Sequence, residues 1–166
     1  TYDYGLKYYS SNHDAFKLIA RHNGETNKLP SNRISSIIEL NDGRWLAGGK
    51  KGAGLALIDF TTNKIESIPY PLIANKKSAN WIAYNMFQDS KGILWIGNNF
   101  ATLTRYDMKN NSMEHFSLPV ENKDDGYIHR IIPGSEDNLW VATTDGVFLF
   151  NTSNNQLSQI YDKAVF

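Results

Sequence analysis

A tryptophan-centred phrase that recurs three times limits the possible fold of this chain more than any other feature. The second copy reads DSKGILWIGNN from Asp89, the first NDGRWLAGG from Asn41, and the third SEDNLWVATT from Ser135. Two further sets of landmarks recur in the same order as Trp45, Trp95 and Trp140: Ile34, Ile82 and Ile128, then Asp59, Asp107 and Asn151. A spacing of about 45 to 50 residues indicates a structural repeat.

Each repeat contains four short apolar segments separated by turn-forming residues. In the second repeat the segments begin at Asn80, Ile93, Thr102 and Met113, with the turn sequences DSKG and KNNS between two of the pairs. Asn and Asp hydrogen-bond their own backbone and Gly adopts positive φ without strain, so these sequences favour hairpins. No stretch sustains an apolar period of 3.6 residues. The pattern therefore predicts a four-stranded antiparallel meander in every repeat.

Meanders repeated at this spacing are typical of β-propeller blades. One meander exposes two apolar faces, and stacking the blades covers both, with the repeated tryptophans filling the space between neighbours. We therefore predict an all-β propeller segment over residues 1–166: the end of a partial blade in 1–29, then blades at 30–78, 79–124 and 125–166. A propeller has roughly four to eight blades, so we expect a fragment of a larger propeller, or several copies completing the ring. A β-sandwich is the alternative fold.

The composition argues against several classes of partner. Lys and Arg total 17, as do Asp and Glu, so the formal net charge is zero and neither nucleic acid nor an anionic membrane is expected to bind this segment. The chain has no cysteine, which excludes disulfides and thiol nucleophiles. Its apolar runs are far shorter than a membrane span.

The repeats resemble the two-component regulator propeller repeat, with the pattern N-x-I-x-x-I-x-x-D-x-x-G-x-L-W-I-G-T-x-x-G-L-x-x-Y-D. The second repeat resembles it most, through Asn80, Ile82, Asp89, Gly92, Leu94, Trp95, Ile96, Gly97, Leu103, Tyr106 and Asp107. Two departures are Ala101, where a glycine is usual, and Asn138, which replaces the turn glycine in the third repeat.

This resemblance implies a periplasmic or other extracytoplasmic location, in the sensor region of a hybrid two-component regulator of the kind found in Bacteroides and related bacteria. It also implies a non-enzymatic role in sensing a ligand, with an oligosaccharide expected, and any histidine kinase would lie outside these residues. Two alternatives stay open: a propeller lyase or hydrolase acting on polysaccharide, and a purely structural or protein-interaction propeller.

The sequence predicts no catalytic residue, metal site or cofactor. The histidines His13, His22, His115 and His129 show no metal-ligand spacing. No serine lies in a G-x-S-x-G context. The rest of the propeller, or another copy of the chain, is the expected protein partner.

A ligand is expected at loops on one rim of the ring. Trp81 stands outside the repeated tryptophan position, and its counterparts in the other repeats are predicted to be Arg33 and Tyr127, each just before the first strand. Sugar recognition uses aromatic platforms with planar polar groups beside them. The predicted ligand-binding residues are therefore Trp81, Asn80, Arg33, Tyr127, His129 and Arg130, with Asn98, Asn99 and Phe100 as secondary candidates.

Overall fold

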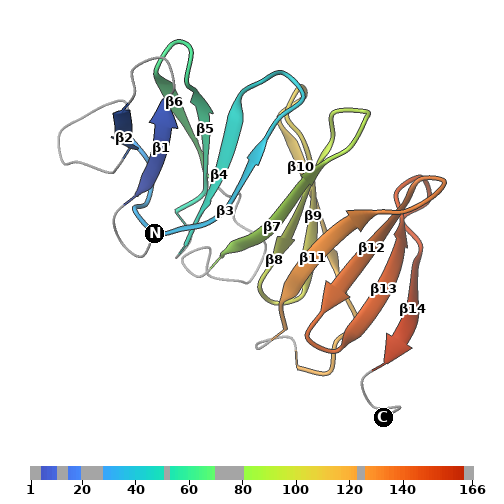
Figure 1. The fold of residues 1–166 in the computed structure, drawn as a ribbon. Coiled ribbons are helices and arrows are strands. Elements are labelled where there is room, and N and C mark those ends of the chain that lie inside the picture. The colour runs from blue at the N-terminus through green and yellow to red at the C-terminus, as the bar shows by residue number, and fades with distance from the viewer. Residues whose placement is uncertain are drawn as a thin grey trace. The chain divides into compact units, whose positions relative to one another are not determined.

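The computed structural model describes residues 5–10, 15–19, 28–50, 53–69, 81–122 and 126–162. These residues form antiparallel β-sheets, and the chain divides into two compact units, Thr1–Ile82 (unit 1) and Ala83–Phe166 (unit 2). Figure 1 shows the strands of both units.

Unit 1 holds a two-stranded sheet and a four-stranded sheet. The first consists of β1 (Leu6–Ser10) and β2 (Ala15–Ile19), and the second of β3 (Ile34–Glu39), β4 (Trp45–Gly49), β5 (Leu55–Asp59) and β6 (Lys64–Ile68), in chain order. Its core contains Leu29, Ala47, Ala56 and Ile58, with Leu6 and Ile19 of the small sheet packed against them. The small sheet therefore covers one face of the four-stranded sheet.

Unit 2 holds two four-stranded sheets. One consists of β7 (Ala83–Gln88), β8 (Leu94–Asn98), β9 (Thr102–Asp107) and β10 (Ser112–Ser117), and the other of β11 (Ile128–Pro133), β12 (Asn138–Thr143), β13 (Gly146–Asn151) and β14 (Leu157–Asp162). In both sheets the spatial order of the strands follows the chain. The meander predicted for each repeat is thus confirmed.

The recurring Asp or Asn at the end of each third strand builds the following turn. The Asp59 carboxylate accepts hydrogen bonds from the N–H groups of Thr61 and Thr62, and the Asp107 carboxylate from those of Lys109 and Asn110. In the third repeat the Asn151 side chain accepts hydrogen bonds from the N–H groups of Ser153 and Asn154. These Asx-type turns explain why the landmark recurs.

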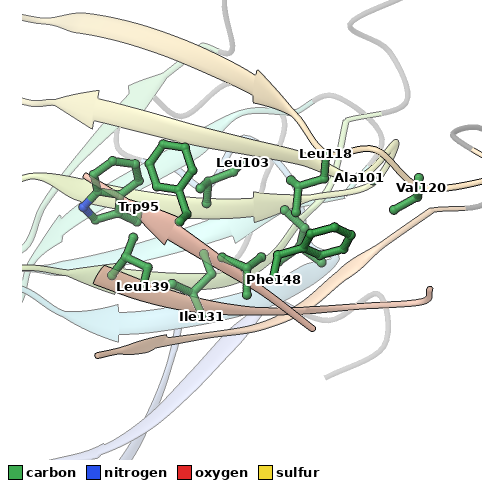
Figure 2. Close-up of a cluster of buried hydrophobic side chains, with 11 residues drawn as sticks. Trp95, Ala101, Leu103, Leu118, Val120, Ile131, Leu139 and Phe148 are labelled. Atoms are coloured by element: carbon green, nitrogen blue, oxygen red, sulfur yellow. The ribbon is translucent and has the colours of Figure 1, made fainter. Parts of the chain in front are cut away.

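Apolar side chains from both sheets of unit 2 form one continuous core (Figure 2). The first sheet and the segment after it contribute Trp95, Ala101, Leu103, Leu118 and Val120, and the second sheet contributes Ile128, Ile131, Leu139, Val141, Phe148 and Phe150. The Trp95 ring lies 5.5 Å from the Phe150 ring, centroid to centroid. The two sheets therefore pack face to face, and Trp95 lies between them.

The three repeated tryptophans have different environments. Trp95 is 1% exposed, and its indole N–H donates to Asp89 Oδ2 at 3.0 Å. Trp45 is half-buried against Phe60, at 6.1 Å between ring centroids. Trp140 is 38% exposed. Trp95 and Trp140 hold the same place in their strands, and the neighbouring sheet decides how deeply each is buried. Trp45 pairs with Ile58, the residue before Asp59, and so holds the place of Leu94.

A buried polar chain crosses the sheet of β7–β10. Asn98 Nδ2 donates to Thr104 Oγ1 at 2.8 Å, and Thr104 Oγ1 lies 2.8 Å from His115 Nδ1. Asn98 and Thr104 are fully buried, and burial lowers the pKa of His115 despite the opposing effect of Glu114. Because Thr104 Oγ1 already accepts from Asn98, its own hydrogen is placed to bind a neutral His115 Nδ1.

Stability is expected to fall as the pH drops below the ordinary histidine pKa of about 6.5. Below that value the unfolded chain binds the proton of His115 before the folded chain does, so protonation favours unfolding. Urea unfolding at neutral and mildly acidic pH measures this effect. His115→Asn should reduce the pH dependence, because it removes the group whose pKa burial lowers. An unchanged pH profile in His115→Asn would contradict the prediction.

Candidate functional site

The first strand of each sheet in unit 2 carries a β-bulge at the same position. In β7 the pairing shifts between Ala83 and Asn85, and in β11 it shifts between Ile128 and Arg130. The extra residues are Tyr84 and His129, each eleven residues before the repeated tryptophan of its sheet. Bulges redirect side chains and are enriched next to functional sites. The fold therefore gives Tyr84 and His129 equivalent special positions.

The equivalent strand of unit 1 has a different arrangement. In β3 the pairing shifts between Ile34 and Ser36, so that Ser35 is the extra residue. Its hydroxyl donates to the Gly48 carbonyl of the adjacent strand at 3.0 Å. The bulge residue of unit 1 is therefore a small serine whose hydroxyl binds its own sheet. The bulge residues with aromatic rings, Tyr84 and His129, lie in unit 2.

Tyr127 contacts both bulge residues of unit 2. Its ring meets that of Tyr84 edge to face, with centroids 5.2 Å apart, and its centroid lies 6.3 Å from that of His129. Burial raises the pKa of Tyr84, and the nearby Tyr127 adds a smaller effect in the same direction, so the Tyr84 hydroxyl stays protonated at neutral pH. We call Tyr84, Tyr127 and His129 the aromatic triad.

The backbone on either side holds Tyr127 in place. Tyr127 N donates to Thr144 Oγ1 at 2.9 Å, and Thr144 N donates to Tyr127 O at 3.2 Å. Across the sheets, Tyr127 forms an antiparallel bridge with Asn99, and Ala101 N donates to Gly126 O at 2.9 Å. The ring is therefore fixed to both sheets before any ligand arrives.

The loop that meets Tyr127 stores backbone strain. Phe100 and Ala101 have φ values of 59° and 44°, in the left-handed region that residues with a Cβ rarely adopt. A Cβ added at Gly126 would lie 3.0 Å from Ala101 Cβ, so the loop packs closely there. Such residues cost about 1–3 kcal/mol each and concentrate at ligand clamps and active sites. This strain marks the same region as the bulges do.

The other predicted ligand-binding residues lie in several places. Trp81 is 1% exposed, and Arg33 is half-buried; both belong to unit 1. Arg130 is exposed and stands on the face of its sheet that carries Ile132 and Trp140. Asn80 lies outside the described residues. Of the predicted residues, the structure brings Tyr127 and His129 together, and it adds Tyr84, which sequence reasoning missed.

One alignment of the repeats was wrong by a residue. Ile82 was matched with Ile128, but Ala83 and Ile128 occupy the same place, because each pairs with the residue three positions after its tryptophan, Asn98 or Thr143. The counterpart of Tyr127 is therefore Ile82 and not Trp81. Counting back from the tryptophan instead of the first isoleucine would have matched Tyr84 with His129.

The described residues contain no group of three or more His, Asp or Glu side chains arranged to hold a metal ion. They also contain no helix long and apolar enough to cross a membrane.

Comparison with known proteins identifies the repeat. The family model for the two component regulator propeller matches residues 77–100, the segment around DSKGILWIGNN. The second repeat therefore matches the two component regulator propeller model. Its matched residues include Tyr84, so one member of the aromatic triad lies on the propeller repeat itself. No curated protein matches the chain in sequence.

Solved structures support the propeller fold. The extracellular domain of the proposed hybrid two component system BT4673 from B. thetaiotaomicron matches with a TM-score of 0.78 and 20% identity, covering 99% of this chain and 20% of that one. The corresponding domain of BT3049 matches with a TM-score of 0.78 and 19% identity, covering 98% and 21%. This chain therefore spans about a fifth of those domains. At this identity the likeness establishes the fold: the sheets are β-propeller blades.

An enzyme shares the fold as well. Virginiamycin B lyase from Staphylococcus aureus matches with a TM-score of 0.69 and 16% identity, covering 95% of this chain and 48% of the lyase. Propellers host both binding and catalysis, so function has to be argued from the side chains of a site.

Proposed function

We propose that this chain is a non-enzymatic segment of an extracytoplasmic sensor propeller in a hybrid two-component regulator. The two-component regulator propeller repeat supports this reading, as does the likeness to extracellular domains of such systems. Signalling would follow from a ligand that binds one arrangement of the sensor better than another and so shifts its population.

The ligand we propose for the aromatic triad is an oligosaccharide. The edges of the triad carry two phenol hydroxyls and an imidazole, which donate and accept hydrogen bonds, while the ring faces offer apolar surface. A sugar presents the complementary combination of hydroxyl groups and C–H faces. The observation that carries the proposal is the contact of Tyr127 with the two equivalent bulge residues, Tyr84 and His129.

Calorimetry of the full chain with a panel of neutral and acidic oligosaccharides tests this proposal. We expect one sugar class to bind, and Tyr127→Ala or His129→Ala to weaken its binding by about tenfold, since an aromatic contact contributes about 1 kcal/mol beyond its buried area. Tyr127→Phe should keep most of the affinity if stacking dominates.

The control for this experiment is Tyr9→Ala, which removes an exposed tyrosine from β1 of unit 1. It should bind the sugar as the parent does. Absence of binding across the panel, or equal binding by the parent and both triad variants, would overturn the proposal. Circular dichroism of each variant separates loss of binding from loss of folding.

A further inference from the structure

A pocket lies at the end of the first strands of unit 2 that is opposite the aromatic triad. It has a volume of about 250 Å³ and lies between the turn that follows β7 and the turn that follows β11. Phe87, Pro133 and Leu139 supply its apolar surface. Phe87 is three residues beyond Tyr84 along β7, which places it about 10 Å from the aromatic triad at the rise of an extended strand. The pocket is therefore separate from the triad.

Opposite charges from two blades meet at this pocket. Lys91 of the first turn donates through Nζ to Asp137 Oδ1 of the second at 2.8 Å. The bond to Asp137 raises the pKa of Lys91, and the bonds from Lys91 and Ser153 lower the pKa of Asp137. Both groups are therefore charged at neutral pH. Both side chains are also largely exposed, so the pair is open to water and is easily separated.

The third charged group in the lining, Asp89, is already engaged. Its Oδ1 accepts from the N–H groups of Lys91 and Ile93, and its Oδ2 accepts from the Trp95 indole. A carboxylate with three donors inside the fold has little capacity for a ligand. The pocket lining therefore offers a ligand one cation, Lys91, and one anion, Asp137.

The anionic side of the pocket is preorganised. Glu136 and Asp137 have φ values of 52° and 58°, so both residues of the tight turn are in the left-handed region. The Asp137 carbonyl accepts from Thr152 N at 2.8 Å, and its Oδ2 accepts from Ser153 Oγ at 2.6 Å. These bonds hold the Asp137 carboxylate in position, whereas the long side chain of Lys91 is free to turn about its own bonds.

We propose that this pocket binds a small zwitterion with an apolar side chain, namely a free α-amino acid. The ammonium group of the ligand would replace Lys91 at the Asp137 carboxylate, and its carboxylate would bind the released Lys91 ammonium. The apolar side chain would lie against Phe87, Pro133 and Leu139. A ligand with one charge would leave Lys91 or Asp137 without its partner, so both charges are required.

Calorimetry of the full chain with L-leucine, leucinamide and isocaproate tests the requirement for both charges. Leucinamide keeps the ammonium group, isocaproate keeps the carboxylate, and all three share the apolar side chain. We expect L-leucine to bind at a single site. The affinity of each analogue should be lower by about tenfold or more, as expected for the loss of a charge-assisted hydrogen bond. No binding of L-leucine, or equal binding of an analogue, would overturn the proposal.

Two variants and a matched control locate the site. Lys91→Met keeps the stem of the side chain and removes its charge, and Asp137→Asn removes the other charge with a residue that tolerates positive φ. Both should weaken L-leucine binding by about tenfold. Arg44→Met breaks the comparable exposed ion pair with Asp42 in unit 1, and it should leave binding unchanged. Equal binding by the parent and both pocket variants would contradict the assignment.

The indole N–H resonance of Trp95 gives a second readout, because it reports on Asp89 in the pocket lining. L-leucine should shift this resonance in the parent and not in Lys91→Met. Because the expected shift occurs without an oligosaccharide, the outcome is independent of the aromatic triad. An unshifted Trp95 resonance in a chain saturated with L-leucine would place the ligand elsewhere and refute the proposal.

Discussion

Replacing Trp95 with alanine is expected to lower the free energy of unfolding by about 3–5 kcal/mol, the usual cost of truncating a buried aromatic residue. The ring is 1% exposed and packs between the two blades of unit 2, against Phe150 and Phe116. The change also removes the donor to Asp89 Oδ2, at the turn that carries Lys91. Trp95 is among the largest fully buried side chains of the described residues.

Urea unfolding of the full chain, followed by far-ultraviolet circular dichroism, measures the loss without relying on tryptophan fluorescence. Trp140→Ala is the matched control, because Trp140 holds the same position in the next repeat and is 38% exposed. It should destabilise the chain by about 1–2 kcal/mol, since less apolar area leaves contact. Equal effects of the two changes would show that Trp95 does not pack as described.

The contrast between Trp95 and Trp140 shows what a repeat pattern predicts. The spacing of the tryptophans predicts four-stranded meanders, because each repeat carries its own turn residues and strand lengths. Asp59, Asp107 and Asn151 act within their own turns, so their role can be read locally. The burial of a repeated residue depends instead on the sheet that covers it, so it cannot be predicted from the sequence of one repeat alone.

The candidate site was harder to predict from the sequence, because its residues are brought together by β-bulges and by the stacking of two blades. A β-bulge shifts the register by one residue without any obligatory sequence signal, so Tyr84 was read as an ordinary strand residue. Lys91 and Asp137 are 46 residues apart and meet because two blades stack. Tyr127 was predicted as the counterpart of Trp81 just before a strand, and His129 was predicted as a residue of that strand beside Arg130. Phe100 was named in the loop that proves strained, although nothing in its sequence indicated a positive φ.

Replacing Gly97 with alanine is the second change from which a large effect is expected, about 1–3 kcal/mol of destabilisation from overpacking. An added Cβ would lie 2.5 Å from Ile128 Cγ2 and 2.9 Å from Ile128 Cβ, closer than such atoms approach. Gly97 follows Trp95 by two residues, so both face the next blade. Trp95 packs against Phe150, and Gly97, which has no side chain, leaves room for Ile128.

The destabilisation expected for Gly97→Ala comes from the neighbouring blade and not from the strand that holds Gly97. Ala142 occupies the position of Gly97 in the other sheet of unit 2, because each pairs with the residue that follows the bulge, so the strand accepts a Cβ there. The φ of Gly97 is also outside the region reserved for glycine. A Gly97→Ala variant as stable as the parent would mean that Ile128 has space to move.

A double-mutant cycle with Ile128→Ala separates the clash from other effects. Ile128 is fully buried, so its truncation alone should cost about 2–5 kcal/mol. In the double variant the Cγ2 atom is gone, and Gly97→Ala should cost less than it does beside an intact isoleucine, with a coupling of about 0.5–3 kcal/mol. Strict additivity would trace the cost to β8 itself. A favourable coupling would show that this glycine exists so that the next blade can approach.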